Sequence, residues 1–236
     1  MKGKYEGPFY LYGSDMREKL LKPARDIRRI LLLGYPKFVT IRFVADHFQL
    51  NVEERHILTR IIISPDRIVP RISKKVTSTD IKYKEILLDG YNVLLGVDNL
   101  LRKKSIWLCD DGYVRDTRRY FSKAKNVKNL EESLDLVIKF LCEANPKSVI
   151  FLLDAQISRS GELAGFIRYK MEEHGISGEA RISKTTDFEL KIYKGHPKND
   201  LVVASSDGIV IDSVSQVIDI PACLMEKMGI EPIRLY

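Results

Sequence analysis

The chain has 236 residues, of which 44% are hydrophobic and 30% charged, and its formal net charge is +7. This much apolar material can build a folded core, which excludes a wholly disordered chain. No apolar run is long enough to cross a bilayer and no apolar segment follows the amino terminus, so we expect a cytoplasmic protein without a membrane partner. Cys109, Cys142 and Cys223 lie far apart without CxxC spacing, and we expect them to be free thiols.

The excess positive charge lies in the first third of the chain. Residues 1–80 hold 16 lysines and arginines against 9 aspartates and glutamates, whereas the remaining residues hold 23 of each kind. Such asymmetry indicates a polyanionic partner for that segment. A well-solvated surface rich in lysine and arginine explains it equally well.

Residues 15–63 are predicted to form three helices with a basic surface. The first has an apolar stripe at helical spacing and ends at Gly34. The second begins at Pro36, and the third begins at Asn51, which a glutamate follows three residues later in a capping-box pattern. We assign residues 1–75 to a small all-α amino-terminal unit. Its candidate nucleic-acid contacts share one face of the first helix and are Lys22, Arg25 and Arg29.

Residues 66–84 are predicted to be a linker, with a short strand at Ile68–Ile72. Beyond the linker, short apolar runs alternate with helical patterns, so we expect residues 76–236 to form an α/β unit with a mostly parallel sheet flanked by helices. The expected strands are Glu85–Leu88, Ser105–Cys109, Lys147–Leu153, Gly178–Ile182, Leu201–Ser205 and Val217–Ile220. The expected helices lie near residues 91–101, 113–124, 129–144, 161–174 and 221–229.

Aspartate follows most of the expected strands, at the end where an open parallel sheet binds its ligands. A single such residue is explained as a helix cap or a turn former. Several of them at one edge would repel each other unless a cation neutralised them. Their oxygen ligands favour Mg²⁺ or Mn²⁺ over zinc. These aspartates are Asp89, Asp110, Asp111, Asp154 and Asp207.

We expect Asp89, Asp154 and Asp207 to hold a first metal ion as catalytic residues. Asp111 would help with a second metal ion or orient the attacking water, and Asp110 is a further metal candidate. The acids of lower rank are Asp116, Asp187 and Asp212.

Further residues are candidates for binding the substrate beside these acids. Asn92 would act as a neutral ligand or orient Asp89, although a hydrogen bond at the helix start explains it too. Ser158, Arg159 and Ser160 precede a helix and could bind a phosphate, although Ser160 taken by itself is better explained as an ordinary helix cap. Arg115 belongs to the same candidate set.

Two stretches carry a resemblance to a known fold. Ile86–Leu94, which contains Asp-Gly-Tyr-Asn, resembles the opening strand of PIN-like nuclease domains and of their NYN branch in particular. Val202–Gly208 resembles the later strand of that fold, which ends in a second metal-binding aspartate. The resemblance implies metal-dependent phosphodiester hydrolysis, most often of RNA, with Asp89 and Asp207 as the best metal ligands.

The whole chain is also similar to an uncharacterised, mainly archaeal family that joins a helical amino-terminal unit to a PIN-like half. The matching patterns lie at residues 34–36, 43–46, 108–116 and 153–161. The leading hypothesis is a metal-dependent ribonuclease to which the basic helical unit delivers RNA. The alternatives are a non-catalytic RNA-binding protein with a PIN-like scaffold and a phosphate- or nucleotide-binding regulator. The sequence is compatible with a homo-oligomer.

Overall fold

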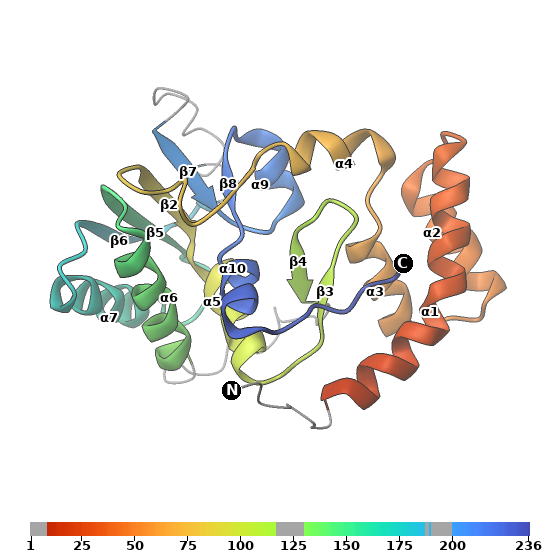
Figure 1. The fold of residues 1–236 in the computed structure, drawn as a ribbon, viewed down its shortest axis with the longest axis horizontal. Helices are drawn as coiled ribbons and strands as arrows, with labels where there is room; N and C mark the ends of the chain where they lie inside the picture. The colour runs from red at the N-terminus through yellow and green to blue at the C-terminus, as the bar shows by residue number, and fades with distance from the viewer. Residues whose placement is uncertain (1–8, 117–129, 187–188, 190–199) are drawn as a thin grey trace.

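Two bodies of structure lie side by side in the computed structural model, which describes residues 9–116, 130–186, 189 and 200–236. Figure 1 shows a group of helices on one side and a sheet with packed helices on the other. No helix of the described chain is both long enough and apolar enough to span a bilayer.

The helical part contains the three predicted helices and a fourth. The first three bury a common apolar core, in which Leu20, Ile27 and Leu58 have no exposed surface. The expected capping box is confirmed, because the Asn51 side chain accepts a hydrogen bond from the Glu54 amide and the Glu54 carboxylate accepts one from the Asn51 amide. The helices of this part are α1 (Phe9–Leu32), α2 (Lys37–His47), α3 (Val52–Ile61) and α4 (Pro65–Ile72).

The strand expected at Ile68–Ile72 is wrong, because these residues lie in α4. Pro65 occupies the first turn of that helix, where its fixed φ suits the helix and its missing N–H removes no hydrogen bond. The two isoleucines of the segment are four residues apart. This spacing places them on one face of a helix or of a strand, so a short apolar run does not show which of the two forms. The predicted linker therefore begins with a helix.

A six-stranded, fully parallel sheet forms the centre of the second part, with the strand order β1-β8-β7-β2-β5-β6. The expectation of a mostly parallel sheet flanked by helices is therefore confirmed. Five of the six expected strands lie in it, and the sixth forms a separate hairpin. The strands of the sheet are β1 (Lys75–Val76), β2 (Glu85–Asp89), β5 (Ser148–Asp154), β6 (Gly178–Ser183), β7 (Leu201–Ala204) and β8 (Val217–Ile218).

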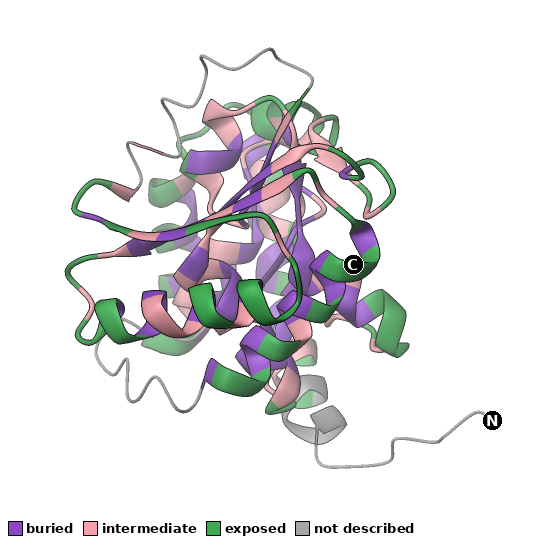
Figure 2. Cartoon of the chain, turned by 90° about the vertical axis from the view of Figure 1, so that its left-hand side faces the viewer, coloured by how far each residue is buried: buried purple, intermediate pink, exposed green. Residues whose placement is uncertain are grey.

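Side chains alternate between the two faces of the sheet, and described helices cover both. Ile86 and Leu88 of β2 join the larger core beneath α5, α6, α7 and α10, whereas Leu87 packs with Val210 of α9 on the opposite face. Figure 2 shows the strands as a buried layer and the exposed residues on the outer sides of the helices. These helices are α5 (Gly90–Leu101), α6 (Glu131–Ala144), α7 (Ser160–Glu173), α9 (Gly208–Ser213) and α10 (Ile220–Met228).

The segment expected as a sheet strand at Ser105–Cys109 belongs instead to an antiparallel hairpin of β3 (Ile106–Leu108) and β4 (Val114–Asp116). The helix expected near residues 113–124 is therefore wrong where β4 lies, and residues 117–124 are outside the described chain. The turn between the strands depends on Gly112, whose φ of 77° suits glycine and whose amide donates to the Cys109 carbonyl at 2.9 Å.

The hairpin contributes side chains to the core of the sheet and to the core of the helical part, because successive side chains of a strand point to opposite sides. Ile106 packs in the core of the sheet, while Trp107 and Cys109 are buried in the core of the helical part. The chain end adds to this contact, since Leu235 is buried in the helical core and Ile233 exchanges backbone hydrogen bonds with β3. Each buried apolar side chain of this kind contributes roughly 1.5–3 kcal/mol, so the hairpin holds the two parts together.

Two consecutive aspartates that we expected as metal ligands at the sheet edge lie instead in the hairpin turn and bind arginines. Asp110 accepts a hydrogen bond from Arg28 of α1 at 2.7 Å. Asp111 accepts hydrogen bonds of 2.8 Å from Arg71 of α4 and from Arg115 of β4. Asp111 has no exposed surface and Asp110 is half-buried. Both carboxylates connect the two parts of the chain, and neither lies at the end of a strand of the parallel sheet.

The two arginines that hold Asp111 also reach the turn after β7. Arg115 donates to the Ser206 carbonyl at 2.7 Å, and Arg71 donates to the Gly208 carbonyl at 3.1 Å. Arg115, which we expected to contact the substrate, is only 5% exposed. Its guanidinium joins the hairpin to the sheet and does not face the solvent.

The Asp111 carboxyl remains charged although it is buried. Burial raises its pKa, but the hydrogen bonds and charges of Arg115 and Arg71 outweigh this effect and hold the pKa below its usual value. The carboxylate in turn satisfies both guanidiniums in the interior, where an unpaired cation would be costly.

Lys37 adds another positive charge to this region. It begins α2 and is half-buried. Burial, together with the charges of Arg115 and Arg71, lowers its pKa to about 8. Because the fold disfavours the cationic form, Lys37 destabilises the protein at neutral pH.

The substitution Asp111→Asn should strongly destabilise the fold, because it removes the buried carboxylate that pairs with Arg115 and one of the two carboxylates that pair with Arg71. Removing one partner of a buried ion pair costs about 3–5 kcal/mol, which urea denaturation would measure as a lower free energy of unfolding. The matched control is Asp46→Asn, whose side chain is 57% exposed and pairs with Arg55. That change should cost less than about 1 kcal/mol, and equal effects of the two substitutions would refute the structural role of Asp111.

The substitution Lys37→Met should stabilise the protein at pH 7 by about 1–2 kcal/mol, after allowance for the partial exposure of the side chain. The folded-state pKa of about 8 lies below the usual 10.5. The folded protein therefore loses this proton first, and the free energy of unfolding should rise with pH between these values. In Lys37→Met that rise should be smaller than in the native protein. Urea denaturation at pH 7 and pH 10 tests this, and parallel pH profiles would contradict it.

Candidate functional site

Three of the predicted metal ligands lie at one edge of the sheet, on neighbouring strands. Asp89 ends β2, and Asp154 ends the adjacent strand β5. Asp207 lies three residues beyond β7, which pairs with β2 on its other side. In the register, Asp89 is opposite Leu152 and Leu88 is opposite Ala204, so the carboxyl ends of all three strands meet at this edge, which we call the aspartate edge.

A serine that the sequence did not indicate connects two of these aspartates. The Ser205 hydroxyl donates to Asp89 Oδ2 at 3.0 Å, and Ser205 Oγ accepts from the Asp207 amide at 3.1 Å. Ser205 is only 1% exposed, so its hydroxyl is fixed in place and orients the Asp89 carboxylate. The sequence signal for it is its position directly after the last residue of a buried strand.

The other two aspartates also have local structural roles. Asp207 caps α9, where its Oδ1 accepts from the Ile209 and Val210 amides. Asp154 Oδ1 accepts from the Gln156 amide at 2.8 Å. In both residues Oδ2 has no hydrogen bond to the described residues, so each carboxylate combines a structural contact with an oxygen that is open to a ligand.

The donors of the aspartate edge suit a hard cation in their chemistry, since all three are carboxylates. They do not form a closed cage, because within the described part of the chain no three His, Cys, Asp or Glu side chains come together closely enough to hold a metal ion. Mg²⁺ is commonly bound by one or two carboxylates together with water and substrate phosphates. One or two of these carboxylates could therefore take part in a cation site of this open kind.

The remaining acidic candidates lie elsewhere. Asp116 accepts a hydrogen bond from Asn99 at 2.7 Å. Asp212 forms ion pairs with Arg67 and Arg71, which hold its pKa below the usual value, chiefly through the hydrogen bond from Arg71. Asp187 is outside the described residues.

Gly90 and Asn92 of the Asp-Gly-Tyr-Asn element fix the backbone of the aspartate edge. A Cβ at Gly90 would lie 2.7 Å from Leu153 Cδ2 and 2.8 Å from the Leu152 carbonyl, so only glycine lets α5 leave β2 this close to β5. Asn92 Oδ1 accepts from the Ser206 amide at 2.9 Å and from its hydroxyl at 3.1 Å. Asn92 therefore fixes the turn after β7, which is a different role from the expected contact with Asp89.

Only part of the expected phosphate-binding segment after β5 is exposed to a ligand. Ser160 is buried, and its hydroxyl donates to the Asp154 carbonyl at 2.6 Å and contacts the Tyr91 hydroxyl at 2.9 Å. Ser158 and Arg159 are exposed. Arg159 pairs with Glu162 at 2.6 Å, so its guanidinium would have to exchange this exposed partner for a phosphate.

The three basic residues expected to contact nucleic acid are all exposed on α1. They are Lys22, Arg25 and Arg29. The helical part that carries them is joined to the turn of Asp207 through Arg71, as described above. The basic face and the aspartate edge therefore belong to one connected structure.

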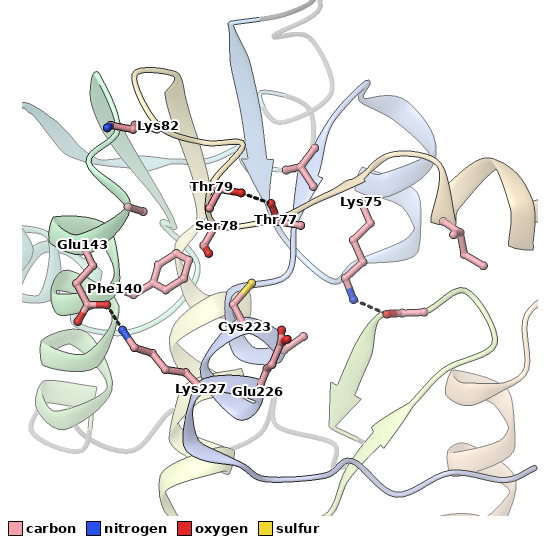
Figure 3. Close-up of a pocket in the computed structure, with 15 residues that line it drawn as sticks. Lys75, Thr77, Ser78, Thr79, Lys82, Phe140, Glu143, Cys223, Glu226 and Lys227 are labelled. Carbon is pink, nitrogen blue, oxygen red and sulfur yellow. Dashed lines mark hydrogen bonds and ion pairs between the residues drawn. The ribbon is translucent and has the colours of Figure 1, made fainter.

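A cavity of about 820 Å³ lies apart from the aspartate edge, between α6, α10 and the turn after β1. Figure 3 shows Cys223 in this cavity below Thr77, and the ion pair between Glu143 and Lys227 beside it. Burial raises the pKa of the Cys223 thiol to about 11, so this group is a poor nucleophile at neutral pH. The cavity contains none of the residues predicted for the site.

Comparisons with known proteins identify the family. The model described as "Protein of unknown function (DUF434)" matches residues 19–74, and the model described as "Domain of unknown function (DUF5616)" matches residues 78–223. The uncharacterized protein MJ0935 of Methanocaldococcus jannaschii is 37% identical over 209 residues, which are 88% of this chain and 97% of that protein. No solved structure matches the chain with statistical significance. The chain therefore belongs to the DUF5616 family, in a two-part form that carries a DUF434 segment ahead of the family domain.

Proposed function

We propose that this protein hydrolyses phosphodiester bonds of nucleic acid, with RNA as the favoured substrate, and that its α/β part is a PIN-like domain that uses Mg²⁺ or Mn²⁺. The observation that carries the proposal is the position of Asp89, Asp154 and Asp207 at the carboxyl ends of three adjacent parallel strands. A parallel sheet binds its ligands at this end, and carboxylate oxygens are the ligands that Mg²⁺ and Mn²⁺ prefer.

Asp89 is the central ligand of this proposal, because β2 lies between β5 and β7. Ser205 holds its carboxylate by a hydrogen bond to Oδ2. Asp154 and Asp207 would each contribute Oδ2 from a backbone that their Oδ1 atoms hold in place. The cation would neutralise the phosphate charge and lower the pKa of a water molecule bound to it.

The basic face of α1 would bind the phosphate backbone of the substrate at a distance from the reaction. Lys22, Arg25 and Arg29 make such contacts without reading the base sequence. We therefore expect affinity that falls steeply with salt and little dependence on sequence.

A second candidate function is RNA binding without hydrolysis. It is supported by the finding that no three acidic side chains of the described residues come within the range of one metal ion. It is supported also by the capping role of Asp207, which explains an aspartate there without any metal.

The test uses Asp89→Asn and Asp207→Asn, separately and together. Asparagine keeps the hydrogen-bond acceptor for Ser205 and is a good helix cap, so the fold should persist while the charge is removed. Mn²⁺ should raise the melting temperature of the native protein, and the native protein should cleave a mixed RNA pool. The double variant should lose both effects, with at least a hundredfold loss of cleavage, roughly the loss that removing one strong electrostatic contact causes.

Glu172→Gln serves as the control, because this exposed carboxylate lies near the end of α7, outside the aspartate edge and outside α1 and α2. The control should leave cleavage unchanged. Cleavage that survives in the double variant would disprove the assignment of the site. Salt-sensitive RNA binding without cleavage by the native protein would favour the second candidate.

A further inference from the structure

We infer that exposed aromatic side chains of α2 and of the turn before it form a stacking surface for single-stranded nucleic acid, an inference that rests on the proposed function. The surface consists of Tyr35, Phe38 and Phe43, with Arg42 among them. It adds base contacts to the phosphate contacts of α1 and specifies the strand form of the substrate.

The rings of this surface are not needed for the core of the helical part. Phe38 is 73% exposed, Phe43 is 67% exposed and Tyr35 is 60% exposed. The core side of α2 is formed by other residues, which are Thr40, Ile41, Val44 and Ala45. Large apolar side chains that gather on a surface at this exposure indicate an interaction site.

Helix geometry places one ring and one cation on the same part of the exposed side of α2. Phe38 and Arg42 are four residues apart in α2 and therefore share one side of the helix. Phe43 lies five residues from Phe38, roughly 140° further round α2, so the two rings stand at the two borders of its exposed side with Arg42 between them. Tyr35 lies in the turn that leads into α2. A guanidinium on the same exposed helix side as aromatic rings suits nucleic acid, since it can pair with phosphate while the rings stack on bases.

The helices α1 and α2 pack against each other, at the right of Figure 1. Lys22 is placed over the ring of Phe48 at the far end of α2, with 5.4 Å between its Nζ and the ring centroid. At the other end, Leu32 leads directly into the turn that carries Tyr35. A strand bound along the pair would meet cations of α1 and rings of α2 together.

Charge decides between nucleic acid and a second copy of this chain as the occupant. From residue 22 to residue 47 the exposed cations of the two helices are Lys22, Arg25, Arg29 and Arg42. The acids there are Asp26 and Asp46, and Asp46 is paired with Arg55 at 2.6 Å. A symmetric dimer through this face would bring like charges together, whereas a polyanion neutralises them. Because a duplex hides the faces of its bases, stacking on the rings requires a single strand.

The experiment measures binding of a fluorescent, unstructured RNA oligonucleotide to the Asp89→Asn protein in EDTA, so that no hydrolysis interferes. Replacing Phe38 and Phe43 by alanine should weaken binding by about tenfold or more, the loss expected when base stacking is removed. The slope of affinity against salt should stay unchanged, because the phosphate contacts remain. Affinity for the corresponding duplex should change little.

Two further variants separate stacking from general apolar contact. Replacing Phe38 and Phe43 by leucine keeps an apolar surface but removes the rings, and it should weaken binding as alanine does. Tyr169→Ala removes an aromatic side chain of 59% exposure from α7 and should have no effect.

Several outcomes would overturn the inference. Unchanged RNA affinity in the alanine variant would do so, as would retention of affinity in the leucine variant. A dimer in sedimentation that the alanine substitutions convert to monomer, without loss of RNA affinity, would assign the surface to a second copy. None of these results depends on cleavage, so a failure here differs from a failure of the aspartate edge, which the Asp89 and Asp207 variants test through metal binding and hydrolysis.

Discussion

The buried contact of Asp111 with Arg71 and Arg115 is the interaction on which the arrangement of this protein depends. Arg71 comes from the helical part and Arg115 from the hairpin. Arg115 also binds the carbonyl of the residue before Asp207, and Arg71 binds the carbonyl of the residue after it. Burying these charges is costly unless every partner is present. The same contact therefore fixes the helical part against the sheet and fixes the turn that carries a candidate metal ligand.

This connection gives the proposed function a physical layout. The basic and aromatic surface of α1 and α2 would hold a single strand, and the aspartate edge would act on it. The hairpin between them is packed into both cores through Ile106 on one side and Trp107 on the other. In the proposed function, two surfaces joined by a hairpin packed into both cores would hold a substrate in one orientation, which is how binding at a distance contributes to catalysis.

Local features of the sequence predicted most of the fold. The capping box of Asn51 and the helical period gave α1, α2 and α3, and short apolar runs gave five of the six strands. The hairpin could not be predicted in the same way, because membership of a sheet depends on partners far along the chain. Asp110, Asp111 and Gly112 end one apolar run and precede another, which fits a strand-to-helix junction as well as the hairpin turn that they form.

Part of the candidate site was also within reach of the sequence. Asp89, Asp154 and Asp207 each follow an apolar run, and the rule that parallel strands end at one edge brought them together. Ser205 and Arg71 were missed, because their partners lie 116 and 40 residues away along the chain. No periodic pattern reports contacts of that kind. The role of Asn92 was missed for the same reason, since it binds Ser206 from across the sheet edge.

The central claim is that a divalent cation binds at the aspartate edge with Asp89 as a ligand. Anomalous diffraction from crystals soaked in Mn²⁺ measures this directly, because the signal locates the ion itself. A peak within coordinating distance of Asp89 and of Asp154 or Asp207 is the predicted result. A well-diffracting soaked crystal with no peak at this edge, or with Mn²⁺ bound only at other carboxylates, would contradict it.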